Sequence, residues 1–258
     1  MSSNSPLKPI KSMQKNHFFA IILASVSLAF ISFAAPAKKA SLTPAAVDTA
    51  VVTAAPSGGA AAGALALYES LNLDSVGLSR PAFEYAVKGY QKLVDSGLVT
   101  NQQYLTIVDF SQSGRKKRLY LIDMEHGTLV KNTFVSHGKN SGLDKAEKFS
   151  NTLNSEQSSL GFYVTGATYT GKHGLSLRLD GKEQGYNSNA MARGVVVHGA
   201  AYVNAARANS AFMGRSQGCP ALPENEYTEV INLIKDGSVL FNYYDGGDYL
   251  QNSPLLNS

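Results

Sequence analysis

The sequence predicts a mostly β domain of the sandwich or barrel type with some α-helix, preceded by short helices. After Thr100, short runs of β-branched and aromatic residues recur, with Gly and Asn between them. Before Thr100, apolar residues recur at three- to four-residue spacing, which is typical of amphipathic helices. The 258 residues are 44% hydrophobic and 16% charged, a composition that indicates a globular protein rather than a disordered one.

The N-terminus has the order of a secretory signal. Three lysines (Lys8, Lys11 and Lys15) precede an apolar run at residues 18–34, and small residues follow it. The run is long for a signal core and short for a membrane span, so residues 1–34 are predicted to be either a signal peptide or an N-terminal membrane anchor. In both cases we expect an exported protein of the periplasm or cell envelope.

The charge of the rest of the chain is close to neutral. The formal net charge is +4, but the three N-terminal lysines account for most of it, because no acidic residue occurs before Asp48. A near-neutral body gives no electrostatic reason to expect nucleic-acid binding. Residues 35–63 are rich in Ala, Pro, Ser, Thr and Gly and are predicted to be a flexible linker.

Residues 64–99 are predicted to be a helical prefix. The first short apolar set consists of Leu65, Tyr68, Leu71 and Leu73. A second helix is expected to begin near Ser79, a favourable N-cap, with Pro81 in its first turn. Gly97 can end that helix in the left-handed conformation. Two such helices are too small to fold alone, so we expect them to pack on the domain that follows.

Residues 100–250 are predicted to be the main domain. Its expected strands are residues 104–110, 118–124, 128–135, 161–165, 175–179, 195–198 and 239–243. Residues 125–127, Glu-His-Gly, are expected to connect the second and third strands as a hairpin. One helix is expected at residues 223–236, with early acidic residues and Gly237 as its stop signal.

Cys219 is the only cysteine of the chain. Exported proteins usually carry cysteines in disulfide pairs. A lone cysteine is therefore a buried small hydrophobe, an intermolecular bridge or a reactive thiol. Its neighbours favour a reactive thiol, because residues 214–222 read as a tight Gly-rich loop and an apolar strand ends upstream at His198.

A cysteine and a histidine together can perform nucleophilic acyl transfer. Only a few per cent of an ordinary thiol is ionised at neutral pH, and a neighbouring imidazole can take its proton. His198 is the candidate base, although an apolar strand can also end in a structural core histidine. Gly218 leaves room beside the thiol, so the amides of Gly218 and Cys219 could converge on a developing oxyanion. The five histidines are scattered and no second cysteine exists, so no metal site is expected.

These segments resemble a known family. His198-Gly199 followed by Ser216-Gln217-Gly218-Cys219 resembles the signature of the L,D-transpeptidase (YkuD-like) family, and residues 214–222 resemble its murein L,D-transpeptidase branch. The resemblance covers roughly residues 80–245. Many members of the wider family carry His at the position of Gln217, which puts recognition of the acyl donor in doubt.

The resemblance implies a YkuD-like, mostly β catalytic domain that acts on peptidoglycan stem peptides without a cofactor. Cys219 would attack a tetrapeptide donor and release its terminal D-Ala, with His198 as the base and the Gly199 carbonyl orienting the imidazole. The acyl group would then pass to an amine, giving a 3-3 cross-link or a tethered acceptor. Two alternatives stay open: a carboxypeptidase or endopeptidase that uses water instead, and a non-catalytic wall-binding module.

The remaining candidates surround this pair in the sequence. Ser216 and Gln217 belong to the cysteine loop, where Ser216 could hold the backbone by a side-chain hydrogen bond. Arg215 could bind a substrate carboxylate or lie in solvent. Tyr202 could line the acyl site or belong to the core. His137, followed by Gly, could flank the cleft or only end a strand.

Overall fold

The computed structural model describes residues 58–258. The predicted signal peptide or anchor at residues 1–34, and the linker up to residue 57, lie outside the described residues. Helix α1 (Gly58–Ser70) begins before the predicted prefix, so the last residues assigned to the linker are helical. Within residues 58–258, no helix is both long enough and apolar enough to cross a membrane.

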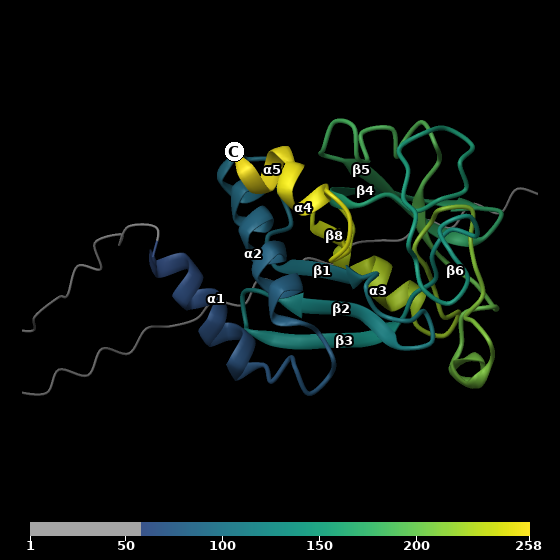
Figure 1. The fold of residues 1–258 in the computed structure, drawn as a ribbon, viewed down its shortest axis with the longest axis horizontal. Helices are drawn as coiled ribbons and strands as arrows, with labels where there is room; N and C mark the ends of the chain where they lie inside the picture. The colour runs from purple at the N-terminus through teal and green to yellow at the C-terminus, as the bar shows by residue number, and fades with distance from the viewer. Residues whose placement is uncertain (1–57) are drawn as a thin grey trace, which may run out of the picture. The chain divides into compact units, whose positions relative to one another are not determined.

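The second prefix helix, α2 (Arg80–Asp95), has the predicted ends. Ser79 is its N-cap, and the Ser79 hydroxyl accepts a hydrogen bond from the Ala82 amide at 3.4 Å. Beyond its C-terminus, Gly97 has a φ of 71°, which favours glycine. The helix buries Phe83 and Leu93 in the core that it shares with the sheet. In Figure 1, α2 lies beside the start of β1 and runs across the direction of the strand.

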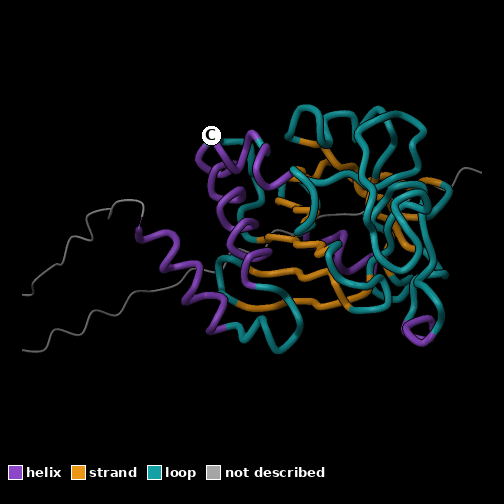
Figure 2. Tube along the Cα trace, viewed as in Figure 1, coloured by secondary structure: helices purple, strands orange, loops and turns teal. Residues whose placement is uncertain are grey.

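One eight-stranded sheet forms the rest of the framework, so the prediction of a mostly β domain with some α-helix is confirmed (Figure 2). Its order is β3-β2-β1-β8-β4-β5-β6-β7, with β1–β8 and β6–β7 parallel and the other pairs antiparallel. The strands are β1 (Tyr104–Asp109), β2 (Lys117–Asp123), β3 (Thr128–Phe134), β4 (Gly161–Gly171), β5 (Gly174–Gly181), β6 (Val196–Gly199), β7 (Ala221–Leu222) and β8 (Val239–Tyr243).

The two edges of the sheet meet just beyond β3 and β7. The Ser136 amide donates to the Ala221 carbonyl at 2.9 Å. The Ser216 amide donates to the His137 carbonyl at 2.9 Å, and the Lys139 amide donates to the Ser216 carbonyl at 2.8 Å. These bonds nearly close the sheet into a barrel, which is one of the two forms, sandwich or barrel, that the sequence predicted. They also fix the loop that carries Cys219 against the chain that leaves β3.

All seven predicted strands are present, and four elements were not predicted. Strand β7 and the helices η1 (Ala205–Asn209), α4 (Tyr249–Asn252) and α5 (Pro254–Asn257) are too short to produce a periodic pattern. The predicted helix at residues 223–236 is shorter, because α3 spans Tyr227–Ile234. The residues before α3 form a turn, in which the Glu226 amide donates to the Pro223 carbonyl at 3.0 Å.

The packed core continues past residue 250, where the main domain was predicted to end. Tyr249 and Leu256 are both buried, and α5 packs on α2 (Figure 1). One close approach in the same core requires a glycine. A Cβ built at Gly89 would lie 2.1 Å from the Phe162 ring, so only glycine lets α2 lie this close to β4.

Candidate active site

Cys219 and His198 line the same cleft, which has a volume of about 510 Å³. His198 belongs to the buried strand β6, and Cys219 is half-buried in the turn that precedes β7. Strands β6 and β7 are parallel, and their register pairs His198 with Ala221, close in sequence to Cys219. The sheet therefore brings together two residues that are separated in the chain.

The imidazole of His198 is held in one tautomer. Its Nδ1 lies 2.9 Å from the carbonyl oxygen of Gly199. A carbonyl oxygen only accepts hydrogen bonds, so Nδ1 carries the proton and Nε2 has a free lone pair. Burial lowers the pKa of His198, although the bond to Gly199 acts in the opposite direction. The neutral imidazole, the form that can accept a proton, is therefore favoured at neutral pH.

The thiol of Cys219 is held by backbone groups. The Val196 amide donates to Sγ at 3.4 Å, and Sγ lies 3.8 Å from the Gly194 carbonyl oxygen. Burial raises the pKa of Cys219, while the Val196 amide, Arg193 and Lys172 act in the opposite direction. Together with the lowered pKa of His198, this indicates a neutral thiol and a neutral imidazole at rest rather than a preformed ion pair.

Ser216 organises the turn that presents the thiol. Its buried hydroxyl donates to the Cys219 carbonyl at 2.6 Å and accepts from the Gly218 amide at 3.1 Å. The Gly218 amide is thereby occupied by a bond within the turn. The Cys219 amide has no hydrogen-bond partner within residues 58–258 and is the better candidate for that donor.

Three further predicted residues lie on the cleft wall: Arg215, Gln217 and Tyr202. Arg215 donates from Nη1 to the carbonyls of Lys139 and Gly142, both at 3.0 Å, which leaves its other nitrogens for a ligand. Gln217 is exposed and its amide nitrogen lies 3.4 Å from Glu156 Oε1.

A family model described as the L,D-transpeptidase catalytic domain matches residues 74–243 of this chain. The chain belongs to this family. The resemblance drawn from the cysteine and histidine segments is thereby confirmed. Comparison with curated proteins found no match.

Solved L,D-transpeptidase structures show only distant similarity to the chain. An L,D-transpeptidase from Mycobacterium smegmatis is 13% identical with a TM-score of 0.36, over 55% of this chain and 59% of that one. One from Xylanimonas cellulosilytica is 15% identical with a TM-score of 0.33, over 70% and 93%. One from Stackebrandtia nassauensis is 13% identical with a TM-score of 0.32, over 72% and 78%. The match thus spans about three-fifths of the first of these chains.

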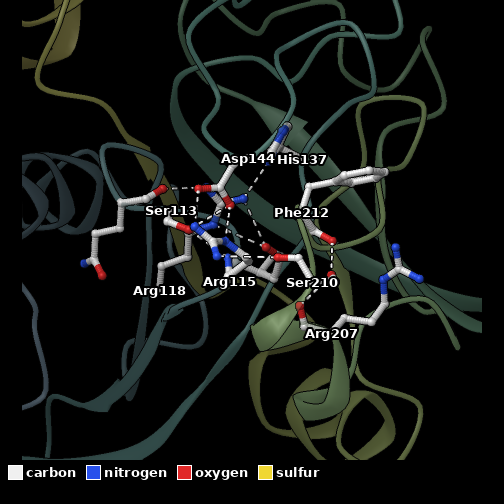
Figure 3. Close-up of polar contacts among 10 residues, drawn as sticks. Ser113, Arg115, Arg118, His137, Asp144, Arg207, Ser210 and Phe212 are labelled. Atoms are coloured by element: carbon white, nitrogen blue, oxygen red, sulfur yellow. Dashed lines mark hydrogen bonds and ion pairs between the residues drawn. The ribbon is translucent and has the colours of Figure 1, made fainter.

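His137 is not brought to the cleft of this L,D-transpeptidase domain. It is buried, with only 1% of its surface exposed, and it lies beside the fully buried Arg118 (Figure 3). Arg118 donates to His137 Nδ1 at 2.8 Å, and His137 Nε2 lies 3.4 Å from the Gly142 carbonyl. Burial and the nearby guanidinium lower the pKa of His137 to about 3. His137 is therefore a neutral buried residue here, which fits the strand-end alternative rather than the cleft-flanking one.

Lys172, His173 and Arg193 are among the cleft residues of the L,D-transpeptidase domain that were not predicted as site residues. Lys172 and His173 lie on the connection between β4 and β5, and Arg193 precedes β6. His173 falls in a segment that carries the family resemblance, which was the one signal available for it. Within residues 58–258, no group of three His, Cys, Asp or Glu side chains is placed to hold a metal ion.

Proposed function

We propose that the chain is an exported cysteine acyltransferase that acts on peptidoglycan stem peptides. One observation carries the proposal: the Cys219 thiol shares a cleft with His198, whose Nδ1–H bonds to the Gly199 carbonyl and whose Nε2 can accept a proton. Membership of the L,D-transpeptidase family supports the substrate class. The basic and apolar N-terminus supports export to the compartment in which peptidoglycan lies.

The first half-reaction forms a thioester. His198 Nε2 takes the thiol proton as the donor peptide binds, and the Cys219 sulfur attacks the carbonyl that precedes the terminal D-Ala. The negative charge that develops on the carbonyl oxygen is stabilised by the free Cys219 amide. The C–N bond then breaks, and the D-Ala amine leaves with the proton that His198 had accepted.

The second half-reaction transfers the acyl group. An acceptor amine attacks the thioester carbonyl and gives a proton to His198 Nε2, and the C–S bond breaks to release the cysteine. The product is a 3-3 cross-link when the amine belongs to another stem peptide, or a tethered acceptor otherwise. Attack by water gives the hydrolase alternative, so the competition between amine and water decides the outcome.

The test is mass spectrometry of the full chain incubated with purified tetrapeptide muropeptides. An adduct on Cys219 with release of D-Ala, followed by dimers, is the expected result. Trimmed monomers without dimers would replace the transferase by the carboxypeptidase or endopeptidase. A folded protein that gives neither adduct nor product would favour the non-catalytic wall-binding module.

Two cysteine variants serve as matched controls in that experiment. Cys219→Ala removes the sulfur, and Cys219→Ser replaces it with a hydroxyl of far higher pKa. Both are expected to abolish release of D-Ala while the protein stays folded. Turnover at the wild-type rate in Cys219→Ser would overturn the assignment of Cys219 as the nucleophile.

A further inference from the structure

The guanidinium of Arg193 joins the catalytic cleft to the loop that precedes β4. Its Nη1 donates to the Ser150 carbonyl at 2.5 Å and to the Ser159 hydroxyl at 3.2 Å. Its Nη2 donates to the Ser155 hydroxyl at 3.1 Å and to the Gln157 carbonyl at 2.5 Å. Four neutral acceptors thus fix one half-buried cation in place.

This cation lies directly against the turn that carries Cys219. A Cβ built at Gly218 would lie 3.3 Å from Arg193 Nη2 and 2.8 Å from the Gln157 carbonyl oxygen. Gly218 also has a φ of 120°, where other residues are strained. The residue that precedes the thiol is therefore in contact with both the guanidinium and the loop segment that the guanidinium holds.

The charge of Arg193 has no carboxylate partner. Within residues 58–258, no Asp or Glu oxygen forms an ion pair with Arg193. Lys139 lines the same cleft, but its charge has a carboxylate partner, because its Nζ lies 2.7 Å from Glu156 Oε1. An uncompensated cation in a partly buried place raises the local potential, and a nearby anion is the group that benefits from it.

The thiolate of Cys219 is such an anion. Sγ is contacted by one backbone amide, and its hydrogen-bond partners in this structure do not include the imidazole of His198. Burial raises the pKa of Cys219, and the charge of Arg193 opposes that change. Burial likewise lowers the pKa of Arg193, and Cys219 opposes that change, as expected of two groups that interact.

We propose that Arg193 is a positioning residue that stabilises the Cys219 thiolate by its fixed charge while it anchors the loop at residues 150–159. The proposal rests on the nucleophilic role proposed above for Cys219. The other charged and titratable groups that line the cleft around Sγ are Lys139, Tyr169, Lys172, His173, His198, Tyr202 and Arg215. No carboxylate lines the cleft within the described part of the chain.

The test measures the reactivity of the thiol with iodoacetamide as a function of pH in the full chain. Arg193→Gln and Arg193→Met both remove the charge, so one folded neutral variant is sufficient. Alkylation at pH 7 is expected to fall roughly tenfold, because the loss of a nearby opposite charge raises a pKa by about one. The midpoint of the pH profile is expected to move to higher pH by the same cause.

Three further variants separate charge from anchoring. Arg193→Lys keeps a cation and is expected to retain the wild-type midpoint even if turnover falls. Ser155→Ala removes one acceptor of Nη2 and keeps the charge, so its midpoint is also expected to be unchanged. Lys139→Met removes a cation that Glu156 already neutralises, and its midpoint is expected to change little.

A folded neutral variant with the wild-type midpoint would overturn the proposal, as would equal shifts in Arg193→Lys and Arg193→Gln. Alkylation requires no wall substrate. A protein whose thiol depends on Arg193 as expected, yet which does not act on muropeptides, would refute the proposed function alone.

Discussion

His173 stacks on His198, with ring centroids 4.4 Å apart and ring planes inclined by 22°. His198 is buried in β6, whereas His173 is exposed on the connection between β4 and β5. A positive charge on either ring disfavours a second charge on the other. Burial is the main cause of the lowered pKa of His198, and His173 and Lys172 lower it further.

The pH dependence of turnover follows from this stack. The proposed base, His198, must be neutral to accept a proton, so activity is expected to be lost as the pH falls through its pKa. His173→Phe keeps an aromatic ring on His198 and removes the charge, which raises the pKa of His198 and moves the acidic limb of the kcat profile to higher pH. His173→Lys keeps a charge without the ring and serves as the comparison. An acidic limb that stays in place in His173→Phe would show that burial alone sets this pKa.

The loop hydroxyl of Ser216 is expected to matter for both stability and turnover. Ser216→Ala removes the bonds to the Cys219 carbonyl and the Gly218 amide, which lowers the free energy of unfolding by about 1–3 kcal/mol. Loss of the fixed turn is also expected to displace Cys219, the proposed nucleophile, so kcat is expected to fall by at least roughly tenfold. Urea denaturation and D-Ala release measure the two effects.

Ser210→Ala is the matched control for that substitution. Its hydroxyl is likewise fixed, because its single proton is shared between the carbonyl oxygens of Arg207 and Phe212, both 2.7 Å away (Figure 3). Ser210 does not line the cleft. A comparable loss of stability with unchanged turnover is expected. Equal losses of turnover in the two variants would contradict a specific role for Ser216.

Much of the fold could be predicted from the sequence, because the strands and α2 carry strong local patterns. The β-branched and aromatic runs of the strands and the Ser79 and Gly97 end signals of α2 are local properties of the chain. Strand β7 carries no such pattern, since it has two residues and exists through its pairing with β6. The predicted start of the helix at residue 223 was wrong, because α3 begins at Tyr227. The early acidic residues and Pro223 are compatible with a turn as well as with a helix.

The sequence points to candidate site residues where one short segment carries the chemistry, but not where the fold brings distant residues to the cleft. The cysteine turn and His198-Gly199 are short motifs with recognisable chemistry. Arg193 and Lys172 are ordinary cations in the sequence, and only the fold places them in the cleft that Cys219 lines. His137 was a candidate site residue in the sequence, but the fold buries it beside Arg118, which is distant in the chain.

The buried pair Arg118 and His137 predicts a pH-dependent stability. His137 has a folded pKa of about 3, well below the 6.5 of an exposed histidine, because burial disfavours its charged form and because protonation would place a second cation beside Arg118. The unfolded chain therefore binds the proton more readily. The contribution of His137 to stability is fully present above pH 6.5 and is lost progressively as the pH falls from 6.5 to 3, by an amount on the order of a few kcal/mol.

Urea unfolding of the wild type and of His137→Gln across that range measures this contribution. His137→Gln is expected to be less stable at pH 7, yet to lose less stability on acidification, because glutamine does not titrate. Other groups titrate equally in both proteins, so the difference between the two curves isolates His137. Parallel curves would mean that His137 is protonated in the folded protein.

Lys172 lies on the cleft wall, where its charge can attract an anionic donor toward Cys219. The cleft is lined by four Lys or Arg side chains and by no carboxylate within the described residues. Lys172 is exposed and makes no ion pair there, so solvent screens its effect on Cys219 and His198, and its main expected effect is on an approaching anionic ligand. Its substitution is therefore expected to change binding more than chemistry.

Lys172→Met is expected to raise KM for a muropeptide with free carboxylates several-fold, and Lys172→Glu more, while kcat changes little. The effect is expected to weaken as salt is added, because an exposed charge is screened. Lys116→Met removes the same charge from an exposed residue that does not line the cleft, and its KM is expected to stay unchanged. If kcat falls instead and KM stays constant, then Lys172 acts on the thiolate together with Arg193, since an interaction made only in the transition state lowers kcat without weakening binding.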